Sequence, residues 1–405
     1  MVVTESGIAS GAATPVDGSV PGWKRRRKRF EAGGRRLLKA GLVVWAMMIA
    51  APVAIVLSPT LPAQAWWPAL IATSYSLYLL IPAVLGIGFG VATWRRRWRW
   101  ATAGVAVIAV MGAAAALVPW AAASRTAAGN GVTLSLSAYF GRGPQVGGPS
   151  RTEVFATLDG QPLKVDIWSA AGPAANPAVV FVHGGSWTTG GRDESPQQNQ
   201  WFVEHGYTVF DIEYRLSPPP RWHQQTSDVK CAIGWVAQHS DRLGIDPADI
   251  TVIGESAGAN LALLAAYTVG TGAFPPSCPV PEHPVRAVIS EYGPTDTAAL
   301  TLDDHIATTV FGGSTDTALQ AYRVTSPLSY VRPGLPATLL LHGRSDHFVN
   351  VAQTTELDTA LTKVAVPHRS VLLPWTEHAY TLIWSSWSTQ ITRGVLDHFL
   401  AAHTR

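Results

Sequence analysis

The sequence predicts an α/β fold: a mostly parallel eight-stranded sheet with helices on both faces, preceded by three transmembrane helices. Two observations lead to this prediction. The first 123 residues contain three long apolar stretches, and the chain after residue 150 alternates short apolar runs with longer amphipathic segments. The length of 405 residues suits two or three domain-sized units, and 47% hydrophobic with only 14% charged residues indicates membrane content.

The three apolar stretches are residues 37–57, 66–93 and 101–123. Apart from Lys39 near the start of the first stretch, they contain no charge. Each reaches the roughly 20 residues with which a helix crosses a hydrocarbon core of about 30 Å. A cleaved signal peptide does not explain three such segments. We therefore expect residues 37–123 to be a three-helix membrane region.

Positive charge predicts the orientation of these helices. The run KRRRKR at 24–29 precedes the first stretch, and WRRRWRW at 94–100 joins the second stretch to the third. Lys and Arg remain on the cytoplasmic side, whereas the loop 58–67 between the first two stretches carries no charge. Residues 1–36 are thus a predicted cytoplasmic tail, and residues from about 124 onward are predicted to lie outside the cytoplasm. Basic clusters beside spanning helices favour anionic lipid as their partner over nucleic acid.

The net charge of +3 conceals an asymmetry between the two parts of the chain. Residues 1–123 hold 13 Lys and Arg against 3 Asp and Glu, whereas residues 124–405 hold 17 against 24. The predicted external part is therefore acidic. It contains both cysteines, Cys231 and Cys278, which in an oxidising compartment could form a disulfide or stay as two buried thiols.

Residues 124–150 are small, polar and Gly-rich, and we interpret them as a linker to a domain at 151–405. Alternation of apolar runs with amphipathic segments is typical of a mostly parallel sheet covered by helices on both faces. The predicted strands are 153–158, 163–168, 178–183, 208–214, 250–253, 285–291, 338–341 and 369–373, and the main predicted helices are 195–205, 222–239, 257–269, 351–364 and 380–402.

Residues at about 295–336 form a predicted cap inserted between two strands. A cap shapes a binding pocket and excludes water from it. Its members Phe311, Tyr322 and Leu328 either line that pocket or, as we expect, pack in the core.

Ser256 lies in the stretch TVIGESAGANL, directly after one predicted strand and directly before a helix. The pattern G-x-S-x-G is weak by itself in a chain with 37 glycines. In a strand-to-helix turn, however, it holds a serine side chain exposed at the top of a sheet. We therefore predict that Ser256 is a nucleophile.

A serine nucleophile requires a base and an orienting carboxylate. Asp346 and His378 each follow a predicted strand, at the sheet edge where sites in α/β folds lie. The chain order Ser, Asp, His is the one expected for an α/β-hydrolase. The neighbouring histidines His342 and His347 do not follow the last strand, so we prefer His378 as the base.

The segment VVFVHGGSW ends a predicted strand with two glycines, Gly184 and Gly185. Unobstructed backbone N–H groups there, together with that of Ala257, form a predicted oxyanion hole. We expect His183 and Trp187 to support this loop rather than to transfer protons.

The segments HGGSW, FDIEYRLSP, GESAG, GRSDHFV and EHAY occur in this order. Together they resemble α/β-hydrolases of the hormone-sensitive-lipase-like, carboxylesterase and arylformamidase groups, from about residue 152 to the end of the chain. The resemblance implies Ser256 as nucleophile, His378 as base, Asp346 as orienter, and N–H donors from Gly185, Ser186 and Ala257. Ser186 stands where the lipase-like branch usually has a third glycine, and the HGG-x-W form is closer to the formamidase and feruloyl-esterase-like branches.

The prediction is a membrane-anchored serine esterase that acts on small or lipid-like esters through an acyl-enzyme. An amidase, formamidase or peptidase with the same triad is the alternative, and a non-catalytic ligand-binding protein on this fold is a third hypothesis. No cofactor is required, and no short cluster of ligands indicates a metal. The oligomeric state stays open.

Overall fold

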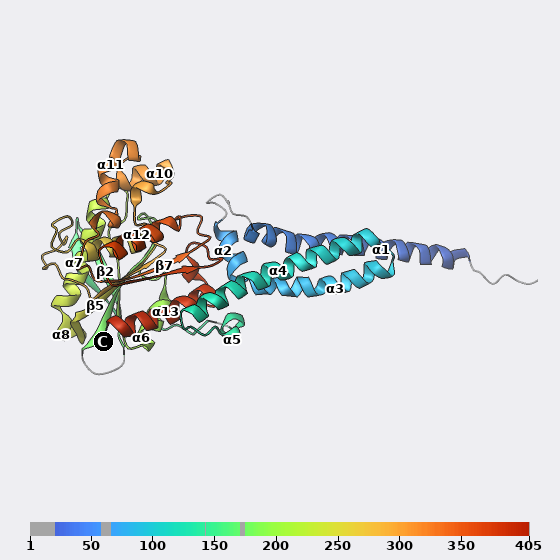
Figure 1. The fold of residues 1–405 in the computed structure, drawn as a ribbon, viewed down its shortest axis with the longest axis horizontal. Coiled ribbons are helices and arrows are strands. Elements are labelled where there is room, and N and C mark those ends of the chain that lie inside the picture. The colour runs from blue at the N-terminus through green and yellow to red at the C-terminus, as the bar shows by residue number, and fades with distance from the viewer. Residues whose placement is uncertain (1–20, 58–65, 142, 171–174, 405) are drawn as a thin grey trace, which may run out of the picture.

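A computed structural model describes residues 21–57, 66–141, 143–170 and 175–404. The domain that contains the sheet lies at one end of an elongated molecule, and long helices extend from it (Figure 1). Residues 1–20 of the predicted basic tail and 58–65 of the predicted outside loop fall outside the described residues.

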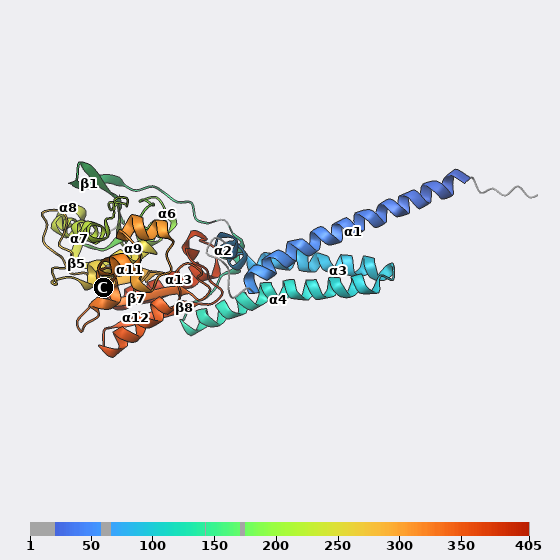
Figure 2. The same cartoon turned by 90° about the horizontal axis from the view of Figure 1, so that it is seen from above.

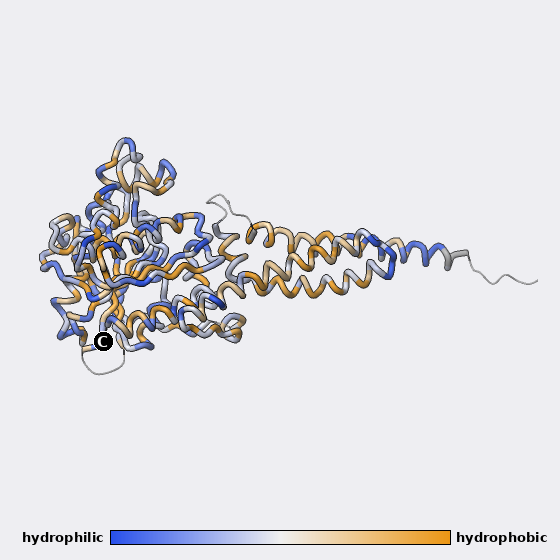
Figure 3. Tube along the Cα trace, viewed as in Figure 1, coloured by the Kyte–Doolittle hydropathy of each residue, from blue (hydrophilic) through white to orange (hydrophobic). Residues whose placement is uncertain are grey.

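Among the described residues, three helices are long and apolar enough to cross a membrane: within α1 (Pro21–Leu57), α3 (Leu80–Arg95) with the preceding 3₁₀ turn η2 (Ser76–Leu79), and α4 (Arg99–Gly129). This supports the prediction of a membrane protein. Figure 3 shows apolar residues along these helices and hydrophilic residues at the end far from the sheet.

The second apolar stretch is not one continuous helix, which corrects the prediction for 66–93. The short helix α2 (Trp66–Ser74) ends before η2, and α3 follows. The Thr73 hydroxyl donates to the carbonyls of Ala69 and Leu70 at 2.9 and 3.3 Å, and such side-chain bonding to the preceding turn weakens a helix at this point. The spanning part begins at Ser76, so α2 lies between the sheet and the long helices (Figure 1).

The segment 124–150, interpreted from the sequence as a linker, contains helical structure. Residues 124–129 continue α4, because their Ala, Thr and Arg side chains are compatible with a helix, and α5 (Leu136–Phe140) follows. The backbone N–H of Ser135 donates to Gln390 in the last helix at 2.8 Å. This segment therefore packs on the domain that contains the sheet.

The sheet has eight strands in the order β1-β2-β4-β3-β5-β6-β7-β8, as the alternation predicted. The pairs β1–β2 and β2–β4 are antiparallel and the remaining pairs are parallel. The bounds are β1 Arg151–Leu158, β2 Gln161–Trp168, β3 Asn176–Val182, β4 Thr208–Ile212, β5 Ile245–Glu255, β6 Ala287–Glu291, β7 Ala337–Gly343 and β8 His368–Leu373.

Side chains alternate between the two faces of the central strands, and each face is covered by helices. Val180 and Val252 pack with α7 (Trp222–Gln238), α9 (Ala257–Tyr267) and α12 (Ala352–Lys363). Phe181 and Ile253 face α6 (Pro196–Glu204) and α13 (Trp387–His403). The apolar core on the Phe181 face of the sheet continues without a break into α4 and α5. The predicted helix 380–402 is in fact a 3₁₀ turn, η6 (Tyr380–Leu382), and then α13, which Ser386 caps.

The segment between β6 and β7 contains five short helices: η3 (Thr297–Ala299), α10 (Asp304–Ile306), η4 (Ala307–Phe311), α11 (Thr315–Val324) and η5 (Pro327–Tyr330). In Figure 1, α10 and α11, which belong to the segment predicted as a cap, project from the sheet. Phe311 and Tyr322 stack at 4.2 Å and are buried in the core, where the sequence analysis expected them. The short helix α8 (Ser240–Leu243) precedes β5.

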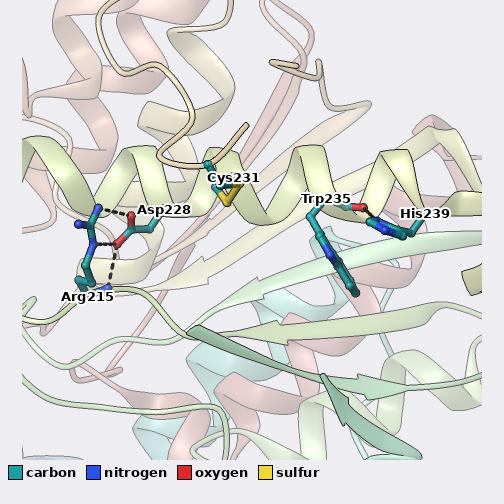
Figure 4. Close-up of a disulfide and its surroundings, with 6 residues drawn as sticks. Arg215, Asp228, Cys231, Trp235 and His239 are labelled. Atoms are coloured by element: carbon teal, nitrogen blue, oxygen red, sulfur yellow. Dashed lines mark hydrogen bonds and ion pairs between the residues drawn. A yellow bond between two sulfur atoms is a disulfide. The ribbon is translucent and has the colours of Figure 1, made fainter. Parts of the chain in front are cut away.

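Cys231 on α7 is joined by a disulfide to Cys278, with the two Cα atoms 5.5 Å apart (Figure 4). Near it, Arg215 donates to the carboxylate of Asp228 from Nε at 2.9 Å and from Nη2 at 2.6 Å. The disulfide ties the segment after α9 to α7. Seen from above, the sheet and its helices form one body, and the three long helices extend away from it (Figure 2).

Candidate active site

Ser256 lies in the sharp turn between β5 and α9. Its backbone has φ 51° and ψ −117°, a region that side chains with a Cβ rarely adopt. The Ser256 N–H donates to the carbonyl of Glu291 at the end of β6, at 2.9 Å. The strained turn therefore projects Ser256 from the carboxyl edge of the sheet.

Two glycines make this turn possible. A Cβ at Gly254 would lie 2.3 Å from the Gly258 backbone, and a Cβ at Gly258 would lie 2.2 Å from the Val182 carbonyl. The start of α9 thus touches the end of β3, which carries the HGG segment. Glycine at both positions is a steric requirement of this close approach.

The structure brings Ser256, His378 and Asp346 together in one hydrogen-bonded chain. His378 Nε2 lies 2.9 Å from Ser256 Oγ, and His378 Nδ1 lies 2.8 Å from Asp346 Oδ2. The His378 ring stacks on Phe348 at 5.3 Å and meets the edge of Tyr292 at 4.8 Å. These contacts hold the imidazole between the hydroxyl and the carboxylate.

Asp346 has a second imidazole partner. Its Oδ2 lies 3.1 Å from Nε2 of the fully buried His342, and the same nitrogen lies 2.9 Å from the Val349 carbonyl. Since both partners are acceptors, His342 carries its proton on Nε2, and Nδ1 accepts from the Thr354 hydroxyl at 2.7 Å. From the sequence, His342 was considered only as an alternative to His378 as the base.

Burial alone would raise the pKa of Asp346, but His378 and His342 outweigh it and hold that pKa well below its usual range. Its other oxygen accepts from the backbone N–H groups of Phe348 and Val349 at 2.8 and 2.7 Å. The carboxylate is therefore ionised at neutral pH and rigidly placed.

Glu377 was missed by sequence reasoning although it is adjacent to His378. Its Oε1 accepts from the N–H groups of His378 and His347, both at 2.8 Å, and its Oε2 lies 2.5 Å from His347 Nδ1. Glu377 thus links the loop that carries Asp346 to the loop that carries His378. The dipeptide EH in the motif EHAY was the only available signal.

A pair of buried acids lies behind the nucleophile. Burial, and then repulsion from Glu255, raise the pKa of Glu291 well above its usual value. Burial also raises the pKa of Glu255, whose Oε2 accepts from Ser195 at 3.0 Å. Glu291 accepts from Gln198 at 3.2 Å. No basic side chain among the described residues forms an ion pair with either acid.

The predicted oxyanion loop lies beside Ser256. A Cβ at Gly184 would be 3.4 Å from Ser256 Cβ, and Ser186 and Trp187 share a cavity with Ser256. Gly185, Ser186 and Trp187 all have positive φ, and the Gly185 carbonyl accepts from the N–H groups of Thr188 and Thr189 at 3.0 Å. Within the described residues, no acceptor pairs with the N–H groups of Gly185, Ser186 or Ala257.

His183 stacks on Tyr214 at 4.4 Å, and its Nδ1 donates to the Gly184 carbonyl at 2.8 Å. Burial lowers the pKa of His183 to about 4, so the ring is neutral at neutral pH. The carbonyl of Trp187 accepts from Gln225 at 2.9 Å, and its ring meets Phe311 edge-on at 5.6 Å. Both side chains therefore lie where they can brace the loop.

A cavity of about 1040 Å³ opens at Ser256. The cap contributes Ala299, Leu300, Leu302 and Ile306 to its walls, and the loop after β7 contributes Phe348. Among the described residues, no group of three or more His, Cys, Asp or Glu side chains could hold a metal ion.

Proteins similar to this chain in sequence and in fold are known. Residues 165–361 match the family model BD-FAE. The chain is 31% identical over 255 residues to the probable carboxylic ester hydrolase LipM of Mycobacterium tuberculosis (strain ATCC 25618 / H37Rv), covering 60% of this chain and 58% of LipM. It is 31% identical to the esterase LipQ of the same strain, covering 63% of this chain and 64% of LipQ. The chain thus spans less than two thirds of the length of these two relatives.

Among solved structures, the apo form of Thermogutta terrifontis esterase 2 is similar, with a TM-score of 0.55 and 22% identity over 64% of this chain and 96% of that one. The sheet order, the turn at Ser256 and this likeness define an α/β-hydrolase domain. The sequence relatives LipM and LipQ are, by their names, an ester hydrolase and an esterase.

Proposed function

We propose that this protein is a membrane-anchored serine esterase, with Ser256 as nucleophile, His378 as base and Asp346 as orienting carboxylate. The hydrogen-bonded chain of these three side chains at the mouth of a cavity carries the proposal. The printed names of the relatives LipM and LipQ support ester hydrolysis. No cofactor takes part in the proposed reaction.

The reaction is a two-step acyl transfer. His378 Nε2 accepts the Ser256 proton while Ser256 Oγ attacks the ester carbonyl, and the alcohol leaves with the proton that His378 returns. Water then attacks the acyl-enzyme with His378 again as base, and the acid leaves Ser256. The ionised Asp346 stabilises the imidazolium that forms in each step and holds its tautomer.

The tetrahedral intermediates carry a negative oxygen that needs donors. The backbone N–H groups of Gly185, Ser186 and Ala257 are unpaired within the described residues, and Gly184 gives them a close approach to Ser256. One such donor typically contributes about 2.7–4 kcal/mol to lowering the barrier.

We further propose a multi-pass topology in the cell membrane, with the α/β-hydrolase domain on the extracytoplasmic side. The turn between α3 and α4 carries Arg95, Arg96, Arg97 and Arg99 and lies at the end of the bundle far from the sheet (Figure 2). Lys39 of α1 lies over Trp98 of that turn at 5.9 Å, so both basic clusters share one end. The positive-inside rule places that end in the cytoplasm.

The corresponding domain limits are residues 1–36 for the tail, 37–123 for the membrane region and 151–405 for the hydrolase domain. Residues 124–150 connect the last two. The disulfide between Cys231 and Cys278 is compatible with an oxidising compartment.

The activity is tested on the full chain in detergent with nitrophenyl esters of increasing acyl length, beside the matching anilides. Ser256→Ala is the test variant, and Ser169→Ala, on an exposed residue away from the site, is the control. We expect ester turnover that Ser256→Ala abolishes and Ser169→Ala retains. Anilide turnover above ester turnover would indicate an amidase or peptidase instead. A folded wild-type chain without Ser256-dependent turnover would leave the non-catalytic binding hypothesis.

The topology is tested with reporters fused after residue 405. In a bacterial host, alkaline phosphatase at that position is expected to be active and green fluorescent protein to be dark. The reverse pattern would place the hydrolase domain in the cytoplasm.

A further inference from the structure

The cavity at Ser256 is not built by the hydrolase domain alone. Trp66, the first described residue after the 58–65 gap and the first residue of α2, lines it together with Ser256 and Phe348. Trp66 is half-buried and packs against the core that joins the membrane helices to the sheet. One wall of the cavity thus belongs to the membrane region.

This wall lies close to the membrane. The spanning segment begins at Ser76, ten residues after Trp66, and the eight residue steps of α2 between Trp66 and Ser74 cover about 12 Å along the helix. Headgroup layers are several Å thick on each side of the hydrocarbon core, and tryptophan is enriched there. Trp67 beside it is 48% exposed and meets Trp66 edge-on at 5.1 Å.

The loop that carries His378 also lies against the membrane helices. Pro374 and Trp375 line the same narrow gap as Thr73 of α2 and Pro119 of α4. The catalytic base therefore follows, by only a few residues, a segment in contact with the spanning region. The distance between the membrane surface and Ser256 is therefore short for a substrate.

The cavity lining is apolar and acidic. Trp66, Leu300, Leu302, Ile306 and Phe348 are apolar, and Phe348 is 45% exposed. Asp303 and Glu356 also line the cavity, and neither forms an ion pair within the described residues. Among the described lining residues none is Lys or Arg. An anionic headgroup would be repelled here, whereas an uncharged one would not.

We propose that the substrate is an uncharged ester that stays partly in the bilayer, of the acylglycerol type, and that Trp66 is a specificity-determining residue for its acyl chain. The inference rests on the proposed esterase activity. Trp66 contributes to the cavity lining from the membrane region, so this region is part of the substrate site and not only an anchor.

The test compares Trp66→Ala with Trp67→Ala in the full chain. Both variants remove one tryptophan at the start of α2, but Trp67 is not among the residues that line the cavity. Each is assayed on nitrophenyl acetate in solution and on dioleoylglycerol in phosphatidylcholine vesicles. We expect Trp66→Ala to lower kcat/KM for dioleoylglycerol at least ten-fold while nitrophenyl acetate changes less than three-fold. Trp67→Ala should change the ratio of the two activities less than three-fold.

The acetate assay keeps the two proposals distinguishable. Equal losses on both substrates in Trp66→Ala, or equal losses on vesicles in both variants, would overturn the role of Trp66. If the wild-type chain hydrolyses neither substrate, the proposed function itself fails.

A further variant tests the effect of the acidic lining on substrate charge. Glu356 is exposed, so Glu356→Lys leaves the core intact. We expect it to raise turnover of dioleoylphosphatidylglycerol relative to dioleoylglycerol several-fold. A wild-type preference for the anionic lipid would contradict the inference.

Discussion

Asp346 is held by two imidazoles, and they have different roles. His378 lies between the carboxylate and Ser256, whereas His342 touches no other member of the proposed triad. A hydrogen bond to a charged group contributes about 1.5–3 kcal/mol. His342 is thus positioned to keep the carboxylate ionised and oriented towards the base.

We therefore expect His342→Ala to lower kcat for a nitrophenyl ester by roughly 10- to 100-fold with little change in KM. His342→Gln can still donate a hydrogen bond from its amide and should recover part of the loss. Steady-state kinetics on folded protein measure both effects. An unchanged kcat in the alanine variant would show that Asp346 needs no second partner.

The buried acid Glu291 makes stability depend on pH. Because burial and Glu255 raise its pKa in the folded state, the folded protein keeps this proton at pH values where the unfolded chain has lost it. Stability is therefore lost as the pH rises from the ordinary carboxyl pKa through the raised one. Each unit of raised pKa corresponds to about 1.4 kcal/mol.

Glu291→Gln removes this titration while keeping the shape of the side chain. We expect the variant to melt at a higher temperature than the wild type at pH 8, by several degrees, and the difference to shrink at pH 5. Thermal melting in one detergent at both pH values measures it. A difference that grows toward pH 5 would contradict the sign of the pKa shift.

At the level of elements, the turn between β5 and α9 depends on close backbone contact with β3. Both glycines of the G-x-S-x-G pattern lie where a Cβ would meet main-chain atoms and not flexible side chains. Backbone atoms cannot move aside without displacing a central strand, so overpacking at this point is costly.

Gly258→Ala is expected to destabilise the protein by about 3 kcal/mol and to reduce ester turnover strongly. Gly148→Ala is the matched control, since a Cβ there meets nothing within 4 Å, and it should change stability by less than about 0.5 kcal/mol. Chemical or thermal unfolding compares the two. Equal, small effects would mean that the helix can move away from β3.

At the level of the whole molecule, one apolar core crosses from the sheet into the membrane region. Tyr139 of α5 stacks on Trp387 of α13 at 4.2 Å, and its hydroxyl accepts from the Leu77 N–H at 3.3 Å. Tyr139 therefore contacts the hydrolase domain and the turn before α3 at once. The hydrolase domain therefore packs directly against the membrane region.

Tyr139→Ala should thus loosen the two parts from each other. Removing a buried aromatic side chain costs about 3–5 kcal/mol, and we expect a fall in Tm of roughly 6–12 °C. Phe140→Ala, at the exposed neighbouring position, should lower Tm by far less. If the two variants melt alike, the stacked contact does not couple the domains.

Local patterns were sufficient for much of this architecture. All eight strands follow from short apolar or β-branched runs, and the parallel strands β3 to β8 are the most continuously apolar because helices cover both faces of the sheet there. The long helices of the membrane region follow from length and composition. The motif spacing also selected Ser256, Asp346 and His378, since each follows a strand and strand ends meet at one edge of the sheet.

Other features depend on contacts between segments far apart in the chain. The positions of His342 and Glu377 depend on which loops meet in the fold. The helix break after Ser74 falls within a continuous apolar stretch, where an averaged hydropathy gives no signal for it. Residues 124–150 were interpreted as a linker because their pattern has no periodicity. Their order comes instead from packing against α13.

The sequence by itself determined the fold class, the membrane helices and the three residues of the proposed triad, because periodicity and motif spacing are local properties. Only the tertiary structure decided that Trp66 reaches the cavity at Ser256 and that the hydrolase domain rests on the membrane region. The physical reason is that α2 meets the loop at Pro374 and Trp375, about 300 residues later in the chain, and such proximity leaves no periodic trace in either segment.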